Sequence, residues 1–124
     1  MYQINEPGIV TDTKNNLMWK QELEPNRYTW DEAREITSDF GGYSDWRLPT
    51  IAELLTLIDF TRYAPAINTE YFPNQTFSFV WSGSLLAAYT YNAWYVDFYG
   101  GYVHDGYVYD GSYAVRLVRS GESS

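Results

Sequence analysis

The residue types that most often carry out chemistry are few in this chain and far apart. There is one histidine, His104, and no cysteine, which excludes disulfides, thiolate metal sites and a cysteine nucleophile. A serine-type triad would need His104 beside a hydroxyl nucleophile and an orienting carboxylate, yet no nucleophile signature such as G-x-S-x-G is present. We therefore predict that the chain is not an enzyme, and that His104 contacts a ligand from a loop.

Three aspartates of the C-terminal half, Asp97, Asp105 and Asp110, are the candidates for a metal site. Carboxylates of this kind can ligate calcium, but these three lack the alternating spacing of a calcium loop. We predict that they are solvated or face a ligand, and that the domain holds neither a metal nor a cofactor.

Tyrosine is the most informative excess in the composition. Aromatic residues make up 19% of the chain, and eight of the 13 tyrosines fall between Tyr89 and Tyr113, interleaved with Gly, Asp, Asn and Ser. Tyrosine offers a large, rigid contact area at low entropic cost, and small polar neighbours add adaptable hydrogen bonds. The segment at about 89–114 therefore predicts a ligand-binding face. Its predicted contact residues are Tyr89, Tyr91, Asn92, Tyr99, Tyr102, His104, Asp105, Tyr107, Tyr109, Asp110, Ser112 and Tyr113.

The charge of the chain narrows the choice of partner. Eight basic residues against 16 acidic ones give a net charge of −8, and no Lys or Arg lies between Arg62 and Arg116. This balance disfavours nucleic acid and anionic membranes as partners and favours a protein or cell-surface ligand. We expect the aromatic patch that binds this ligand to have no Lys or Arg nearby. No apolar run reaches the ~20 residues of a membrane span and no signal peptide is apparent, so we expect a soluble chain used at a cell or virion surface. Nothing indicates an oligomeric state.

The elements that must position these residues form an α+β domain over residues 1–124. Capping boxes at Thr29-Trp30-Asp31-Glu32 and Thr50-Ile51-Ala52-Glu53 predict two helices, the first reaching Phe40 before Gly41-Gly42 stops it. A hairpin is expected where Ile9-Val10 and Leu17-Met18-Trp19 flank a polar turn. We predict that both helices pack on an antiparallel sheet of short strands.

The expected strands lie mostly after the second helix. They are Phe77 to Trp81, Ala93 to Phe98, Tyr102-Val103 and Ala114 to Val118. Alternation predicts that Trp94, Val96 and Phe98 share a buried face. The core should also contain Trp46 and Trp81, and we expect Val103 and Val108 to point inward. Antiparallel pairing should then gather the contact residues onto one face.

Several motifs in a fixed order carry a family resemblance. They are Leu17-Met18-Trp19, Asp45-Trp46-Arg47-Leu48-Pro49-Thr50, Trp81-Ser82-Gly83, Ala93-Trp94-Tyr95-Val96-Asp97-Phe98 and Val115-Arg116-Leu117-Val118-Arg119. From about Val10 to Arg119, the chain resembles the C-terminal domain of Legionella collagen-like proteins. It departs from that family in the hairpin, where Asn15-Asn16 stands in place of a common Thr-Gly. The resemblance implies a C-type-lectin fold of the formylglycine-generating-enzyme-like variety. The cysteine oxidation of such enzymes is not implied, because the chain lacks cysteine.

The chain also resembles the variable proteins of diversity-generating retroelements, in which miscopied adenines turn chosen codons into NNC or NNT. Such codons never encode Lys, Glu, Gln, Met or Trp, and none of these types occurs among the 16 residues from Tyr99 to Ala114. The resemblance implies a binding module with a diversified face. The alternatives are a lectin-like adhesion domain of fixed specificity for glycans or matrix, and an ordinary Tyr-rich sheet.

Overall fold

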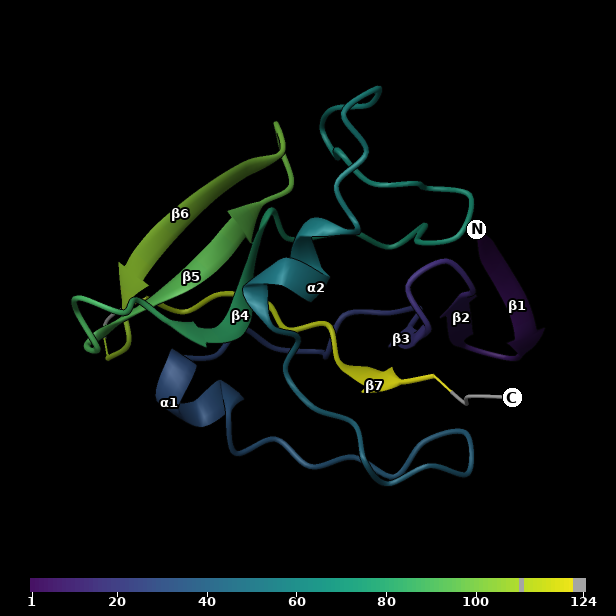
Figure 1. Cartoon of the computed structure of the whole chain (residues 1–124), viewed down its shortest axis with the longest axis horizontal. Coiled ribbons are helices and arrows are strands. Elements are labelled where there is room, and N and C mark those ends of the chain that lie inside the picture. The colour runs from purple at the N-terminus through teal and green to yellow at the C-terminus, as the bar shows by residue number, and fades with distance from the viewer. Residues whose placement is uncertain (110, 122–124) are drawn as a thin grey trace.

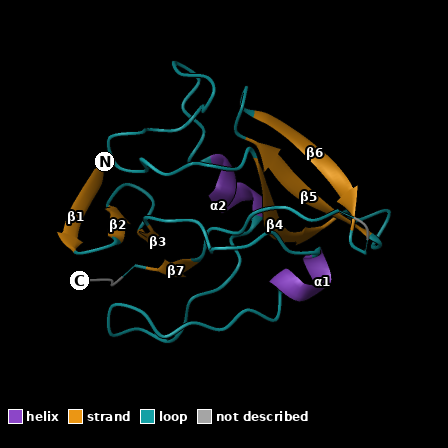
Figure 2. Cartoon of the chain, turned by 180° about the vertical axis from the view of Figure 1, so that it is seen from behind, coloured by secondary structure: helices purple, strands orange, loops and turns teal. Residues whose placement is uncertain are grey.

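Two antiparallel sheets stand side by side, and two short helices lie against them (Figure 1). The computed structural model describes residues 1–109 and 111–121. Along the chain the elements are β1 (Tyr2–Glu6), β2 (Ile9–Asp12), β3 (Leu17–Lys20), α1 (Trp30–Ala33), α2 (Ile51–Leu55), β4 (Phe79–Leu85), β5 (Asn92–Asp97), β6 (Tyr102–Tyr107) and β7 (Val118–Ser120). The first sheet has the strand order β1-β2-β3-β7 and the second β4-β5-β6; Figure 2 shows both from behind. Long loops connect many of these elements, so the α+β architecture is mostly sheet and loop.

The β2–β3 hairpin forms as the sequence predicts. Asp12 pairs with Leu17, and the Asp12 Oδ1 accepts hydrogen bonds from the backbone N–H groups of Lys14 and Asn15 at 3.0 and 3.2 Å. Asn16 completes the turn in the left-handed region, at φ 54°. An Asp side chain that caps its own turn in this way replaces backbone hydrogen bonds that the turn leaves unmade. The strand β1, which the sequence did not indicate, pairs with the outer edge of β2.

Both predicted capping boxes are present, but the helices are short. The first helix was expected to reach Phe40 and instead ends at Ala33. The backbone N–H and C=O of Phe40 pair with Tyr43 at 2.9 and 3.1 Å across Gly41-Gly42, whose φ values are 63° and 87°. These bonds form a tight turn that a helix through Phe40 would exclude. Among the described residues, no helix is long and apolar enough to cross a membrane.

The segment Asp45-Trp46-Arg47 ties α2 to β7. The guanidinium of Arg47 donates to both carboxylate oxygens of Glu53 in α2, at 2.7 and 2.8 Å. The backbone of Arg47 pairs with Val118 through two hydrogen bonds of 2.9 Å. Asp45 accepts two hydrogen bonds from the guanidinium of Arg119, at 2.6 and 3.1 Å. The motif that carries the family resemblance is therefore part of the scaffold.

The stretch from Ala114 to Val118 is buried along its whole length. It was expected to be one strand, but β7 begins only at Val118. Before that residue, Ala114 pairs with β4, and the carbonyls of Val115 and Leu117 accept from segments near the end of β3. This stretch, which we call the crossing segment (residues 114–118), passes between the two sheets. It does not form a regular strand, because its hydrogen-bond partners change every one or two residues.

Arg116 lies in the middle of the crossing segment and is buried. Its guanidinium donates to the carbonyls of Lys20 and Gln21 and, at 2.6 Å, to the side-chain oxygen of Gln75. It also lies 4.8 Å from the ring centre of Phe72. Burial lowers the pKa of Arg116 to about 9. The charge is tolerated because carbonyl oxygens surround it and replace water.

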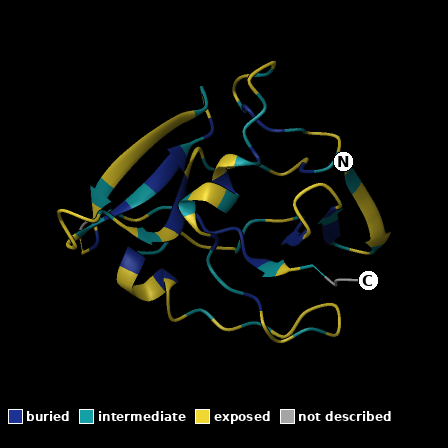
Figure 3. Cartoon of the chain, in the orientation of Figure 1, coloured by how far each residue is buried: buried dark blue, intermediate teal, exposed yellow. Residues whose placement is uncertain are grey.

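The expected burial of tryptophans holds for Trp46 and Trp81 and is wrong for Trp94, which is only partly buried. Its strand, β5, is the middle strand of its sheet and has buried residues on both sides (Figure 3). Val96 and Phe98 are buried on the side of Trp94, as predicted, but Tyr95 is buried on the opposite side. Trp94 pairs with Asp105 of the exposed strand β6, so water reaches its indole ring.

We expect the two tryptophans to differ in their effect on stability. Trp81→Ala should lower the free energy of unfolding by about 3–5 kcal/mol, because it leaves a cavity among fully buried side chains. Trp94→Ala should cost less than half as much, since its site is open to water. Urea unfolding followed by circular dichroism measures both values, and equal losses for the two variants would contradict the burial described here.

We also expect the Arg47–Glu53 pair to make stability depend on pH. The hydrogen bond from Arg47 lowers the pKa of Glu53 below its usual 4.5. A carboxyl whose pKa is lowered by folding stabilises the fold at pH values above its pKa in the unfolded chain. This contribution is lost as the pH falls through its pKa in the folded protein. Glu53→Gln keeps the helix cap but loses the ion pair, and should cost about 0.5–1 kcal/mol at pH 7.

Urea melts at pH 7 and at pH 3 measure this dependence, and the difference between Glu53→Gln and wild type should shrink at pH 3. Glu32→Gln is the matched control, because Glu32 occupies the same cap position in α1 and makes no ion pair within the described residues. A deficit of Glu53→Gln that is unchanged at pH 3 would argue against the ion pair.

Candidate ligand-binding face

Antiparallel pairing in the β4-β5-β6 sheet decides on which side each predicted contact residue lies. Directly paired residues point to the same side, and successive residues point to opposite sides. Tyr95 pairs with His104, whereas Trp94 pairs with Asp105. His104 and Asp105 therefore lie on opposite sides. The expectation that pairing gathers all contact residues onto one face is wrong, because Tyr102–Tyr107 runs as a regular strand with a period of two residues.

One side of this sheet carries a continuous group of aromatic rings, which we call the aromatic face. Its members are Phe79, Trp81, Tyr95, Tyr102, His104 and Tyr113. Tyr113 lies at its centre, with its ring 4.5 Å from those of Trp81 and Tyr95. The ring of His104 lies 5.6 Å from that of Tyr95, and Tyr102 follows at 6.4 Å from His104. The face thus grades from buried rings at Trp81 to exposed rings at Tyr102.

The opposite side of the β5–β6 hairpin packs Val96 and Phe98 into the core and carries polar side chains at its Asn92 end. Asn92 donates a hydrogen bond of 2.9 Å from its side chain to the Asp105 carboxylate. Asn92 also pairs with Tyr107, whose ring therefore points to the same side. Val103 lies on this side too and is exposed, so the prediction that it points inward is wrong. The cause is that β6 is an edge strand and is exposed along most of its length.

Further tyrosines gather at the two ends of the β5–β6 hairpin. At one end, the N–H of Val108 donates to the carbonyl of Tyr91 at 2.9 Å, and the rings of Tyr107 and Tyr109 lie 5.4 Å apart. Val108 is buried there, as predicted. At the other end, Tyr99 begins the turn into β6 and is exposed. The loops thus carry tyrosines beyond both edges of the aromatic face.

Most of the predicted contact residues reach the solvent. The exposed ones are Tyr89, Tyr91, Tyr99, Tyr102, His104, Asp105, Tyr107, Tyr109 and Ser112. Asn92 and Tyr113 are partly buried. Asp110 lies outside the described residues. Their part in binding stays a prediction.

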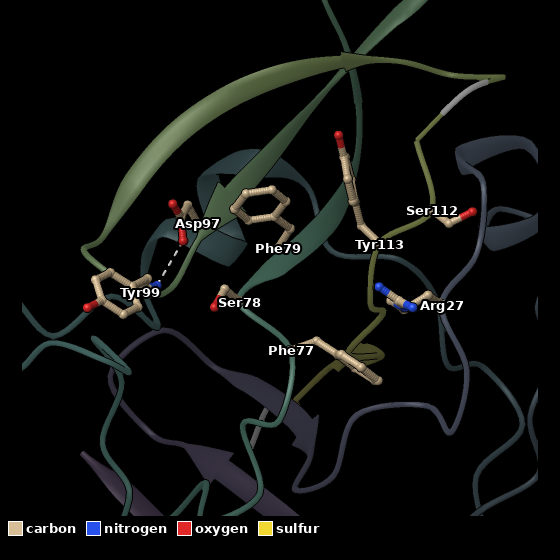
Figure 4. A pocket seen from close by; sticks show the side chains of 8 residues that line it. All are labelled: Arg27, Phe77, Ser78, Phe79, Asp97, Tyr99, Ser112 and Tyr113. Carbon is tan, nitrogen blue, oxygen red and sulfur yellow. Dashed lines mark hydrogen bonds between the residues drawn. The ribbon is translucent and has the colours of Figure 1, made fainter.

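A pocket of about 500 Å³ opens at the edge of the aromatic face (Figure 4). Its lining residues are Arg27, Phe77, Ser78, Phe79, Asp97, Tyr99, Ser112 and Tyr113. Tyr99, Ser112 and Tyr113 were predicted from the sequence as contact residues. The others come from β4 and its approach, from the end of β5 and from the loop before α1.

Arg27 is the charged pocket residue that the sequence did not indicate; Phe77, Ser78 and Phe79 were not predicted as contact residues either. We expected no Lys or Arg near the aromatic patch, and that expectation is wrong. Tyr28 and Tyr113 exchange two backbone hydrogen bonds of 2.8 and 2.9 Å, which bring the loop before α1 alongside the end of the Tyr-rich segment. The two positions are 85 residues apart in sequence, and no local pattern marks this bridge.

The surroundings of Tyr95 favour its neutral form. Burial, followed by the neighbouring Tyr113 hydroxyl, raises the pKa of Tyr95 to about 12. A phenol with a raised pKa keeps its proton at neutral pH. Tyr95 therefore contributes a neutral ring to the aromatic face, and not a base or an anion.

The residues considered for catalysis or metal binding do not come together. His104 makes no hydrogen bond with any described serine or carboxylate, so no triad is assembled around it. Asp97 and Asp105 belong to opposite sides of the hairpin by their strand positions. Within residues 1–109 and 111–121, no three His, Cys, Asp or Glu side chains form a group that could hold a metal ion. The described residues of this face offer aromatic contacts and hydrogen bonds, with the charges of Arg27 and Asp97 at its edge.

These features define a small, mostly β domain that presents an aromatic face and an open pocket lined by aromatic, hydroxyl and charged side chains. The family model of the Lcl C-terminal domain, the C-terminal domain of Legionella collagen-like proteins, matches residues 8–119. The chain belongs to this family, since the match covers most of its length. A search of curated proteins found no match.

We expect exposed and packed positions of the Tyr-rich segment to differ in how much stability is lost when asparagine replaces the native residue. Tyr107→Asn should change the free energy of unfolding by less than about 1 kcal/mol, because Tyr107 is exposed. Gly106→Asn should cost about 1–3 kcal/mol. A Cβ at Gly106 would lie 3.3 Å from the rings of Tyr95 and Tyr113, so the core of the aromatic face would have to move.

Urea melts of both variants measure the contrast. Tyr102, His104, Asp105, Tyr109 and Ser112 should behave like Tyr107 when they are exchanged for one another's residue types. Unfolding by most such exchanges would mean that the segment belongs to the core.

Proposed function

We propose that the domain is a non-enzymatic ligand-binding module with a C-type-lectin fold of the formylglycine-generating-enzyme-like variety. The observation that carries the proposal is the concentration of exposed tyrosines on and around the β5–β6 hairpin, on a scaffold whose own motifs are buried or ion-paired. Exposed aromatic area of this kind is a liability on a surface with no partner. Rigid tyrosines among small polar residues are also the composition of antibody binding loops.

We propose further that a retroelement diversifies this face. Among the described residues of the window 99–114, most are exposed, whereas Val108 and Ala114 are buried and Gly106 and Tyr113 pack against other aromatic rings. A scheme that varies exposed positions and keeps packed ones would change the ligand without unfolding the domain. Sequencing the gene tests this directly. Codons ending in C or T across the window, with an adenine-rich near-copy and a reverse-transcriptase gene nearby, are the expected result.

The partner of the face is a protein or another cell-surface ligand. Family membership supports use on a prokaryotic surface, because the matched domain belongs to collagen-like proteins. The net charge of −8 opposes contact with nucleic acid and anionic lipid. Fixed recognition of glycans or matrix is the alternative use of the same surface.

A display experiment tests binding at the face. The library randomises the exposed positions Tyr91, Tyr99, Tyr102, His104, Tyr107, Tyr109 and Ser112 and is selected against unrelated proteins. Folded binders should emerge, and alanine at the best tyrosine should weaken binding by about 2 kcal/mol or more, roughly 30-fold.

A control library at exposed positions of β1 and of the β2–β3 turn, Gln3, Asn5 and Lys14, should yield fewer and weaker binders. If both libraries display folded protein and neither gives a binder, the proposed face is refuted. Selection of glycan binders alone, with identical specificity across variants, would favour the fixed adhesion domain.

A further inference from the structure

The pocket beside the aromatic face holds two opposite charges at its two ends. In Figure 4 the guanidinium of Arg27 points into the pocket from one side, and Asp97 lies at the other, with Phe79 and Tyr113 between them. No salt bridge joins the two charges. Each is therefore available to a ligand.

Arg27 differs from the other arginines of the chain. Arg34, Arg47, Arg62 and Arg119 each form a salt bridge with an aspartate or glutamate, and Arg116 is buried among backbone carbonyls. Arg27 is exposed, lies 5.3 Å from the ring centre of Phe77, and has no carboxylate partner among the described residues. The chain has 16 acidic residues, yet none of those described pairs with Arg27. Its guanidinium, which lies beside the Phe77 ring, can therefore bind an anionic group of a ligand.

Asp97 is the complementary site for a cation. One of its carboxylate oxygens accepts a hydrogen bond of 2.9 Å from the backbone N–H of Tyr99, which fixes the side chain at the end of β5. Its other oxygen has no hydrogen-bond partner among the described residues, and no lysine or arginine forms a salt bridge with it. A ligand cation placed there would also contact the exposed ring of Tyr99.

We infer that the pocket binds a polypeptide segment that carries an acidic side chain, an apolar side chain and a basic side chain. The acidic group pairs with Arg27, the basic group with Asp97, and the apolar side chain packs on Phe79 and Tyr113. The hydroxyls of Ser78 and Ser112 line the same space and suit amide groups. This inference rests on the proposed function and names the chemistry that the face recognises.

A polypeptide fits this arrangement better than a zwitterionic lipid headgroup. In phosphocholine only two carbons separate the charges, whereas here aromatic rings lie between Arg27 and Asp97.

The pocket combines residues from outside and from inside the window proposed to vary. Arg27, Phe79 and Asp97 lie outside the window 99–114, whereas Tyr99 and Ser112 lie within it. Diversification of the window would thus change the shape of the pocket while its two charges stay the same.

The test is selection of random 12-residue peptides on the full chain and on two variants that each remove one of the two charges. On wild type, enriched peptides should carry an acidic and a basic residue flanking an apolar one. Arg27→Gln should lose the acidic preference alone, and Asp97→Asn the basic preference alone. For a selected peptide, each variant should weaken binding about fivefold or more at low salt, and less as salt rises.

Arg34→Gln and Asp31→Asn are the matched controls, because they remove exposed charges of α1 away from the pocket and should leave binding unchanged. Circular dichroism confirms that each variant is folded. Peptides without both charges, binding insensitive to Arg27 and Asp97, an absence of enriched peptides, or displacement by phosphocholine would each overturn the inference. The randomised-face library tests the proposed function separately, since binders that ignore the pocket would refute only the inference about its ligand.

Discussion

Backbone hydrogen bonds from the crossing segment join the two sheets, and most of the other features depend on them. Ala114 pairs with β4 in the second sheet, Val118 pairs with β3 in the first, and Val118 also pairs with Arg47. Because the segment is buried throughout, none of these bonds competes with water. The loop before α1, the family motif at Asp45–Arg47 and both sheets are thus held by five consecutive residues.

The position of this segment explains how the proposed variable surface could coexist with a stable domain. The Tyr-rich segment ends where the crossing segment begins, and its last aromatic residue, Tyr113, is hydrogen-bonded to Tyr28. Before that point, β6 is an edge strand that pairs with β5 alone. Most side chains of β6 are therefore exposed and lie outside the buried core. The physical separation of buried and exposed positions is what the proposed function requires.

The same arrangement makes the proposed binding surface two-sided. A regular edge strand sends alternate side chains to opposite faces, so the tyrosines and the histidine of β6 do not act as one patch. The aromatic face continues into the pocket, where Arg27 and Asp97 add charge. The opposite side is separate: it packs Val96 and Phe98 into the core and carries the hydrogen-bonded polar pair of Asn92 and Asp105. A single ligand that touched both would have to wrap around the hairpin end.

The sequence by itself determined the local features. The capping boxes at Thr29 and Thr50 and the Asp12 turn depend on residues within three positions of one another, so their patterns are readable in the chain. The family motifs likewise identified the Lcl C-terminal domain.

Only the tertiary structure decided the length of α1, the partial burial of Trp94 and the place of Arg27. Each of these depends on a partner that is distant in sequence or on which face of a strand is covered. Strand period tells which residues share a side but not what packs against it. The pocket exists because Tyr28 meets Tyr113, and nothing in either local sequence specifies that contact.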